Sequence, residues 1–329
     1  MDDFQNIPWQ RIVKTGQQTF LDTDWFVVSW ILGRFCNYRC SYCWTHGRGD
    51  IVDFYTYDTY TNLVDEIKRQ AGERGFKNYH WTLSGGEPTT YKRFNDLVAY
   101  IANDPALPQQ SMYLTTNLSP SQNFWHRWVD ASVPIQTRSI TASFHDEFAD
   151  EAEFIDKCVM LTELGIRMNI NQVMALDRFD EQYERCARFF AKGVSVTLKP
   201  MTTPDATLII EGYTPEQMHL MQSAFSQLNT DGTRFYQMAL YDDAGTKYLL
   251  DHAERFNSFD FRSFTGWNCT AGYQSMVIKK DRIRRSYSCR DQDLGSVEKG
   301  FTLFKEIKPC ITPNCVTSAD TKIPKSKNV

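Results

Sequence analysis

The sequence lacks a long apolar run, an excess of basic charge, and an even set of cysteines that could pair completely as disulfides. No stretch approaches the roughly 20 apolar residues that a membrane-spanning helix needs, and the polar, acidic start MDDFQNIPWQ is unlike a secretory signal. The formal net charge of -4 does not indicate the clustered basic surface that a nucleic-acid-binding protein needs. No internal repeat or low-complexity tract occurs. These absences predict a cytoplasmic protein without nucleic-acid or membrane partners.

The nine cysteines, being an odd number, argue against a full disulfide framework. In a reducing compartment, tightly grouped cysteines more often hold metal or perform redox chemistry. Seven of them form two groups toward opposite ends of the chain: Cys36, Cys40 and Cys43, then Cys269, Cys289, Cys310 and Cys315. The other two, Cys158 and Cys186, lie on apolar faces of expected helices and are interpreted as core residues.

Short β-type runs alternate with helical periodicity over most of the chain, which predicts parallel strands joined by helical crossovers. Strands are expected at 26–32, 79–84, 112–116, 139–144, 168–174 and 194–199. Helices are expected at 57–74, 91–102, 122–129, 150–164 and 179–191, and a sixth follows the cap Thr214 to about residue 228. Six such units make either a doubly wound sheet or an incomplete β/α barrel, and periodicity alone leaves both open.

The alternation of strands and helices ends toward the C-terminus. A β-hairpin is expected from strands 275–278 and 283–288, followed by a short helix at 301–307 and a cysteine-bearing loop. The basic run KKDRIRR at 279–285 is interpreted as a solvated hairpin face. The predicted organisation is an N-terminal extension (1–24), an α/β domain (25–229), a bridge with one helix (230–264), a small cysteine-rich domain (265–320) and a mobile basic tail (321–329).

The string CNYRCSYC places Cys36, Cys40 and Cys43 in a C-x3-C-x2-C spacing directly after the first expected strand. Thiolates this close in sequence must surround one centre. Structural zinc takes four ligands, and only His46 is near enough in sequence to be the fourth. A 4Fe–4S cluster held by three cysteines leaves one iron open to an outside ligand, which is a catalytic feature. The spacing favours that cluster over a zinc knuckle or buried structural cysteines.

With this spacing, and with Tyr42 before the third cysteine, the chain resembles the radical S-adenosylmethionine (SAM) superfamily. The string LSGGEPTT matches that family's GGEP motif at Gly85, Gly86, Glu87 and Pro88. Two glycines expose backbone at a strand end, and the glutamate offers an acceptor for an ammonium group. The resemblance implies a partial (β/α)6 TIM-like barrel in which the motif holds the SAM amino group while the open iron binds SAM.

Further candidates lie at the ends of expected strands, where a β/α barrel keeps its active site. The third strand ends in Thr116-Asn117, as in the family's T-N-G, but Leu118 replaces the glycine. Three residues are therefore expected to contact SAM beside Tyr42 and the GGEP motif: Asn117, Ser143 and Asn171. The fifth strand also carries Asn169 and Gln172. The catalytic candidates are His145, for which a structural hydrogen bond is the alternative, and Lys199, which binds SAM carboxylate, substrate or solvent.

The second cysteine group flanks the expected hairpin, so folding the hairpin brings its flanks together. The pattern resembles the twitch module, a shortened SPASM domain, with Gly272 soon after the first cysteine and Leu294-Gly295 after the second. Its turn, Lys280-Asp281, departs from the usual Asp-Gly. The resemblance implies one auxiliary 4Fe–4S cluster fully ligated by Cys269, Cys289, Cys310 and Cys315, and structural zinc is the alternative.

The resemblance implies that a flavodoxin- or ferredoxin-type donor delivers one electron and that SAM is cleaved to a 5′-deoxyadenosyl radical. That radical removes hydrogen from an unactivated carbon, with the auxiliary cluster as electron relay in a dehydrogenation or epimerisation. No separate peptide-recognition domain precedes the first strand, which favours a small polar substrate. A peptide-modifying enzyme is the second hypothesis, and a non-catalytic zinc-binding protein is the third.

Overall fold

The computed structural model describes residues 6–43, 49–104, 109–203, 208–225, 228–229, 231–233, 235–251, 253, 256, 263–289, 292–313, 315 and 317–327. The chain divides into two compact units. One, here called the cysteine-triplet unit, consists of Trp30–Asp65 and His80–Arg234. The other, the C-terminal unit, consists of Met1–Ser29, Glu66–Tyr79 and Phe235–Val329. Within the described ranges no helix is both long and apolar enough to span a membrane.

The cysteine-triplet unit is built on strands in the order β3-β4-β5-β6-β7, preceded in that order by β2, most of which belongs to the C-terminal unit. Their bounds are β2 Trp25–Ile31, β3 Asn78–Ser84, β4 Gln110–Thr116, β5 Thr137–Phe144, β6 Arg167–Met174 and β7 Ser195–Pro200. The pairs β4–β5, β5–β6 and β6–β7 are parallel. Among the described strands β7 ends this order, so the sheet is open, as a partial barrel requires. The predicted α/β fold with parallel strands is confirmed.

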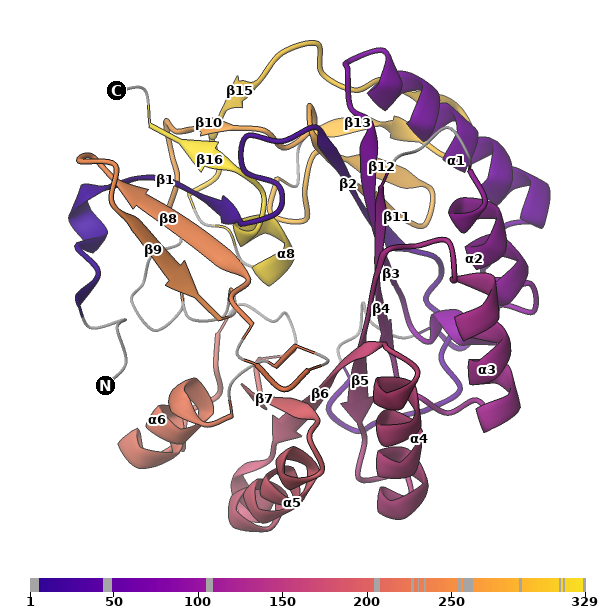
Figure 1. Ribbon diagram of the computed structural model, residues 1–329, viewed down its shortest axis with the longest axis vertical. Coiled ribbons are helices and arrows are strands. Elements are labelled where there is room, and N and C mark those ends of the chain that lie inside the picture. The colour runs from indigo at the N-terminus through magenta and orange to yellow at the C-terminus, as the bar shows by residue number, and fades with distance from the viewer. Residues whose placement is uncertain are drawn as a thin grey trace. The chain divides into compact units, whose positions relative to one another are not determined.

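Helices cover one face of these strands (Figure 1). They are α2 Phe94–Ala102, α3 Gln122–Ala131, α4 Glu151–Glu163 and α5 Phe179–Ala191, with α6 Pro215–Ser223 after β7 and α1 Tyr57–Gly72 between β2 and β3. All six helices expected within the α/β domain are present. The capping box of α6, in which Thr214 and Gln217 each bond the other's backbone N–H, shows why that helix begins where it does.

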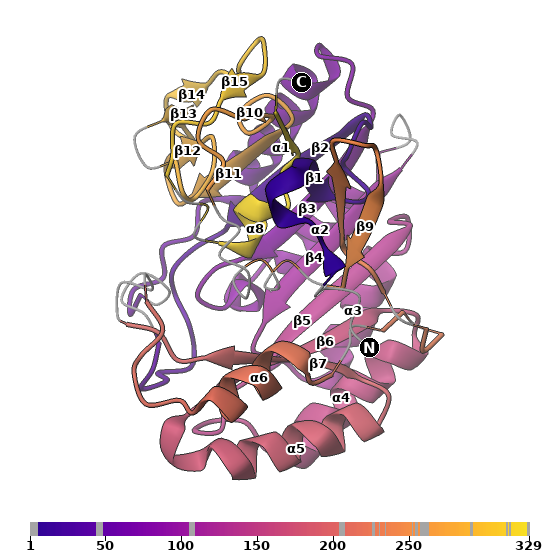
Figure 2. The same cartoon turned by 90° about the vertical axis from the view of Figure 1, so that its left-hand side faces the viewer.

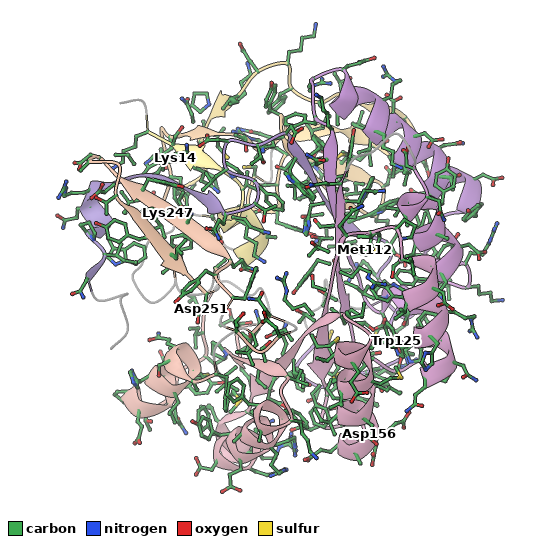
Figure 3. All side chains as sticks on the ribbon, in the orientation of Figure 1. Lys14, Met112, Trp125, Asp156, Lys247 and Asp251 are labelled. Atoms are coloured by element: carbon green, nitrogen blue, oxygen red, sulfur yellow. The ribbon has the colours of Figure 1, made fainter. Side chains whose placement is uncertain are left out.

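Strand alternation separates an apolar face from a polar one. On β6 the side chains of Met168, Ile170 and Met174 are buried, whereas Asn169 and Asn171 between them are half-exposed. The buried set faces the helices, because successive side chains of a strand point to opposite sides. Figure 3 labels Met112 of β4 and Trp125 of α3, two fully buried members of this core.

The C-terminal unit contains a six-stranded sheet in the order β15-β10-β16-β1-β8-β9. Its strands are β1 Ile12–Gln17, β8 Met238–Asp242, β9 Lys247–Leu250, β10 Asn268–Cys269, β15 Lys308–Pro309 and β16 Lys325–Ser326. An antiparallel run of four further strands, at the upper left of Figure 2, continues the other sheet beyond β2 in the order β14-β13-β12-β11-β2. These strands are β11 Ser275–Lys279, β12 Arg282–Arg284, β13 Asp293–Ser296 and β14 Gly300–Phe301. The short helix α8 (Ser318–Thr321) completes the unit.

The expected hairpin is confirmed as β11 and β12, and its turn residue Lys280 has a left-handed φ of 55°. Three expectations for this unit are wrong. No helix forms at 301–307, where β14 is followed by extended chain leading to β15. The tail is not mobile at residues 325 and 326, which pair with β1 and β10. Arg285, at the end of the supposedly solvated basic run, is buried. The expectation of one helix at 230–264 missed the β8–β9 hairpin, and several residues of that span lie outside the described ranges.

Candidate functional site

The loop carrying the first cysteines rests on the glycines that follow β3. The backbone N–H of Gly86 donates to the carbonyl of Gly33 at 3.0 Å, and that of Glu87 donates to Phe35 at 2.8 Å. A Cβ at Gly86 would lie 2.3 Å from the carbonyl oxygens of both Arg34 and Phe35. Only glycine permits this approach. The double glycine is thus required by contact with the cysteine loop, whatever ligand it also meets.

The Glu87 carboxylate is buried and bonded to its own chain. Its Oε1 accepts from the N–H and hydroxyl of Thr89 and from the hydroxyl of Thr116, and its Oε2 accepts from the N–H of Asn117 at 2.6 Å. Burial is the largest influence on its pKa and raises it, while these hydrogen bonds lower it. The sequence predicted an acceptor presented to an ammonium group. Here the carboxylate instead joins the end of β3 to the end of β4, with Pro88 opening the one-turn helix η3 (Pro88–Thr90).

Asn117 lies against the cysteine loop from the end of β4. Its Nδ2 donates to Oδ1 of Asn37 at 2.9 Å and is 4.0 Å from Sγ of Cys36. The next residue, Leu118, has φ 58°, the left-handed conformation that glycine adopts most easily. Its backbone is nevertheless satisfied, because its N–H donates to the Thr116 hydroxyl and its carbonyl accepts from buried Lys157. These bonds explain how leucine is tolerated where the family has glycine.

The end of β5 holds the loop from a third side. The Tyr42 hydroxyl lies 2.8 Å from Nδ1 of His145, and the two rings stack with centroids 5.9 Å apart. Glu147 accepts from the Ser41 backbone N–H at 3.0 Å and from its hydroxyl at 2.6 Å. The loop is therefore held over the carboxyl ends of β3, β4 and β5, the edge where β/α folds place their active sites.

The electrostatics of this loop favour neutral side chains unless a cation binds. Burial lowers the pKa of His145 to about 4, which keeps the imidazole neutral near pH 7. Burial is also the main cause that raises the pKa of Tyr42. Burial, followed by the charges of Glu147, Cys43 and Cys36, raises the pKa of the Cys40 thiol to about 12. Metal coordination removes that penalty, because it deprotonates a thiol outright.

The three thiols differ in accessibility: Cys40 is buried, Cys36 is half-buried and Cys43 is exposed. The charges of Cys43 and Cys36 both contribute to the raised pKa of Cys40. A group bound here would be held from the strand side and accessible from the other, which fits a cluster with one open position. His46, the other ligand considered from sequence, lies outside the described residues.

The remaining candidates divide between the two faces of the sheet. Ser143 and Asn171 are register partners on β5 and β6, and both are half-exposed on the polar face. Asn169 bonds Asn171 on that face, and Lys199, the register partner of Val173 and the residue before the end of β7, lies there too. Gln172 lies on the other face, where it is buried and donates to the Val173 carbonyl. Four of the strand candidates thus share a face and Gln172 does not.

Sequence reasoning missed three residues that hold the loop: Asn37, Asp53 and Glu147. Asp53 Oδ1 accepts from the backbone N–H groups of Arg34 at 2.8 Å and Phe35 at 3.3 Å. Asn37 donates to the Ser119 hydroxyl at 2.9 Å. Their partners stand 18 to 106 residues away in the chain, so no local pattern could have identified them.

The second cysteine group converges within the C-terminal unit. All four thiols are buried, and three of them, Cys269, Cys310 and Cys315, belong to one hydrophobic cluster. The Cys289 Sγ lies 3.3 Å from the hydroxyl of Thr312. The backbone carbonyl of the same threonine accepts a hydrogen bond from the Cys310 thiol. Burial is the main cause that raises the pKa of Cys310, and nearby Cys269 and Cys289 raise it further. The same effects raise the pKa of Cys315 to about 12, with Cys269 and Cys310 as the neighbouring thiols.

Within the described residues, no three His, Cys, Asp or Glu side chains already have the arrangement of a metal site. Both ligand sets therefore stay predictions. What the structure adds is that Cys40 and all four thiols of the second set are buried, and that buried thiols need a cation to be stable as thiolates.

A profile of the Radical SAM superfamily matches residues 30–221. Among curated proteins, the GTP 3',8-cyclase of Yersinia pestis is 27% identical over 161 residues, or 45% of this chain and 45% of the relative. That of Pasteurella multocida (strain Pm70) is 26% identical over 163 residues, or 46% and 45%. The match therefore spans less than half the length of these relatives.

Two solved structures share the fold. Native anSMEcpe with bound AdoMet has a TM-score of 0.54 at 13% identity, covering 84% of this chain and 79% of that chain. Streptococcus suis SuiB bound to precursor peptide SuiA has a TM-score of 0.50 at 14% identity, covering 83% and 63%.

Proposed function

Because the chain belongs to the radical SAM superfamily, it is an enzyme, and we propose that it cleaves SAM reductively to abstract hydrogen from a small polar substrate. The observation that carries the proposal is the cysteine loop held over the carboxyl ends of three strands by Gly86, Asn117 and Tyr42. Superfamily membership replaces the hypothesis of a non-catalytic zinc-binding protein.

Cys36, Cys40 and Cys43 would hold a 4Fe–4S cluster, and Cys269, Cys289, Cys310 and Cys315 would hold a second one. When bound, these groups and SAM supply a 5′-deoxyadenosyl radical for hydrogen abstraction and an acceptor for the electron that the substrate radical loses with a proton. The one electron needed to start comes from a flavodoxin- or ferredoxin-type donor.

The chain's own residues position these groups. Neutral His145 and Tyr42 bond each other beside the third cysteine, which fixes both rings against the cysteine loop. Asn117, Ser143 and Asn171 place amide and hydroxyl groups near the same strand ends, in positions suited to the polar groups of SAM. Glu87 fixes the strand ends on which these side chains stand.

The polar face of the sheet supports a small polar substrate. Strands β3 to β7 contain no Asp or Glu, whereas their polar-face positions carry hydroxyl, amide and cationic side chains. Hydrogen bonds link neighbours across the strands, as between Tyr113 and Thr141 at 2.5 Å and between Thr197 and Asn169 at 3.2 Å. Such a face suits a hydroxyl-bearing molecule that is neutral or anionic, and it disfavours a cationic one. The curated relatives are named for GTP, which has this chemistry.

A peptide-modifying enzyme is the second candidate, supported by the fold shared with SuiB, whose structure holds a precursor peptide. Deuterated candidates separate the two hypotheses, because abstracted deuterium appears in 5′-deoxyadenosine. Transfer from sugars or nucleotides supports the first proposal, and transfer only from a peptide supports the second.

SAM cleavage itself is tested with anaerobically reconstituted, reduced protein. Wild type and the control Cys186→Ala, which alters a buried core thiol of α5, should form 5′-deoxyadenosine. Cys40→Ala should form none. Equal yields from Cys40→Ala and wild type would overturn the proposal.

A further inference from the structure

Arg285 is a fully buried cation in the C-terminal unit. It follows β12 and is 1% exposed, although the basic run to which it belongs suggested a solvated position. Its Nε donates to the Ala271 carbonyl at 2.9 Å, and its Nη1 donates to the Gln292 side-chain oxygen at 2.7 Å. Its guanidinium also lies 5.7 Å from the ring centre of Phe304.

The remaining donors of Arg285 reach the two strands that carry cluster cysteines. Nη2 donates to the carbonyls of Lys308 at 2.9 Å and Cys269 at 3.3 Å, and Nη1 donates to that of Pro309 at 3.3 Å. Pro309 directly precedes Cys310. One side chain therefore joins β10 to β15 and fixes the backbone at two of the four thiols.

Each of these acceptors is a neutral oxygen, so the hydrogen bonds satisfy the donors of Arg285 without neutralising its charge. A buried, uncompensated guanidinium is costly, and buried charges in proteins are normally paired with an opposite charge. Four thiolates around a metal centre would supply that charge beside it.

A second buried cation lies on the same group of cysteines. Lys325 of β16 is 3% exposed, is the register partner of Cys269 on β10, and donates to the Asp320 and Ile323 carbonyls. One buried carboxylate, Asp320, also lies here, and it accepts from Ser288 and from the backbone N–H of Tyr287. Among the residues that the structure describes here, two buried cations and one buried carboxylate accompany the four thiols.

We propose that Arg285, with Lys325, compensates the negative charge of a cluster held by Cys269, Cys289, Cys310 and Cys315 and raises its reduction potential. This inference rests on the second cluster of the proposed function. Reduction adds one negative charge to the thiolate-bound cluster, and a fixed cation nearby stabilises the reduced form more than the oxidised one. Arg285 is a positioning residue, and its charge makes the cluster a better acceptor of an electron from a substrate radical.

The test uses the full chain carrying Cys36→Ala, Cys40→Ala and Cys43→Ala, so that the second cluster alone is observed. Its midpoint potential is measured by redox titration followed by electron paramagnetic resonance, with iron content determined in parallel. The parent for comparison is the chain with these three replacements alone. Arg285→Gln should still bind iron, with a midpoint potential more negative than that of the parent. The midpoint potential of Arg285→Lys should lie nearer to that of the parent, and that of Lys325→Met should also be more negative. The matched control is Arg282→Gln, because Arg282 is exposed on the same hairpin and pairs with Asp293.

An unchanged potential in iron-loaded Arg285→Gln would overturn the inference, as would a parent that binds zinc instead of iron. If Arg285→Gln binds no iron, recovery of the cluster in Arg285→Lys supports a role for the charge, and failure of both variants overturns it. SAM cleavage by the unmutated triplet is a separate readout. If the chain forms no 5′-deoxyadenosine but the Arg285 variants shift the midpoint potential, the proposed function is contradicted and this inference is supported.

Discussion

The Tyr42 hydroxyl lies 2.8 Å from Nδ1 of His145, 103 residues away, and joins the residue before the third cysteine to the residue after β5. The imidazole is neutral near pH 7, and its tautomer sets which of the two groups donates this bond. The bond gives His145, a catalytic candidate from sequence, a structural partner within the cysteine loop. The same contact leads to a prediction about pH.

Protein stability should fall with acid partly through His145. Its pKa drops from 6.5 to about 4 on folding, so the unfolded chain takes up a proton below pH 6.5 that the folded chain resists. Stability is lost as the pH falls through that interval, by about 2 kcal/mol at pH 5 for this residue. Urea unfolding at pH 7 and pH 5 should show a smaller acid loss for His145→Gln than for wild type. Exposed His126→Gln is the control, and an identical loss in all three proteins would contradict the prediction.

Gly86→Ala should detach the cysteine loop. The added Cβ meets two backbone carbonyls at 2.3 Å, which cannot move aside as a flexible side chain would. Reconstituted variant should lose the first cluster, about half of the iron if two similar clusters bind. Gly72→Ala is the control, since its Cβ meets nothing within 4 Å, and it should change unfolding free energy by less than about 1 kcal/mol. Full iron content and full SAM cleavage in Gly86→Ala would refute this account of the motif.

Lys157→Met should destabilise the chain. The buried ammonium donates to the Leu118 carbonyl at 3.2 Å and pairs with Glu153 at 2.7 Å. Methionine retains the apolar stem but removes the donor to a buried carbonyl, which costs about 1–3 kcal/mol. Denaturant unfolding measures the change, with exposed Lys192→Met expected within about 0.5 kcal/mol of wild type. A variant as stable as wild type would show that the left-handed Leu118 needs no such support.

Cys310→Ala should separate SAM cleavage from substrate turnover. The change removes one ligand of the second cluster and leaves the cysteine triplet intact, so 5′-deoxyadenosine should still form while oxidised product falls. Iron should decrease by about half for two similar clusters. Chromatography of both products from the same reaction gives the ratio. Equal loss of both would mean that the second cluster mainly supports folding.

Many elements of the fold were predicted from short-range patterns in the sequence. Strand and helix periods depend on near neighbours, so the six α/β units were predicted, as was a hairpin of strands 275–278 and 283–288, which the structure has as β11 and β12. The spacing of the triplet and the GGEP motif are read directly from the sequence. Strands of two residues, such as β10, β15 and β16, carry too few side chains for any period. They form because distant backbones pair there, which is why the tail and residues 301–307 were misinterpreted.

The sequence by itself determined which thiols are grouped and which family chemistry they belong to, because residue type and spacing suffice for that. Only the tertiary structure decided that Glu87 is enclosed by its own chain and that Arg285 is buried at the second cysteine group. Burial and hydrogen-bond partners depend on chain segments that meet in space, often more than a hundred residues apart, and no local pattern encodes such meetings.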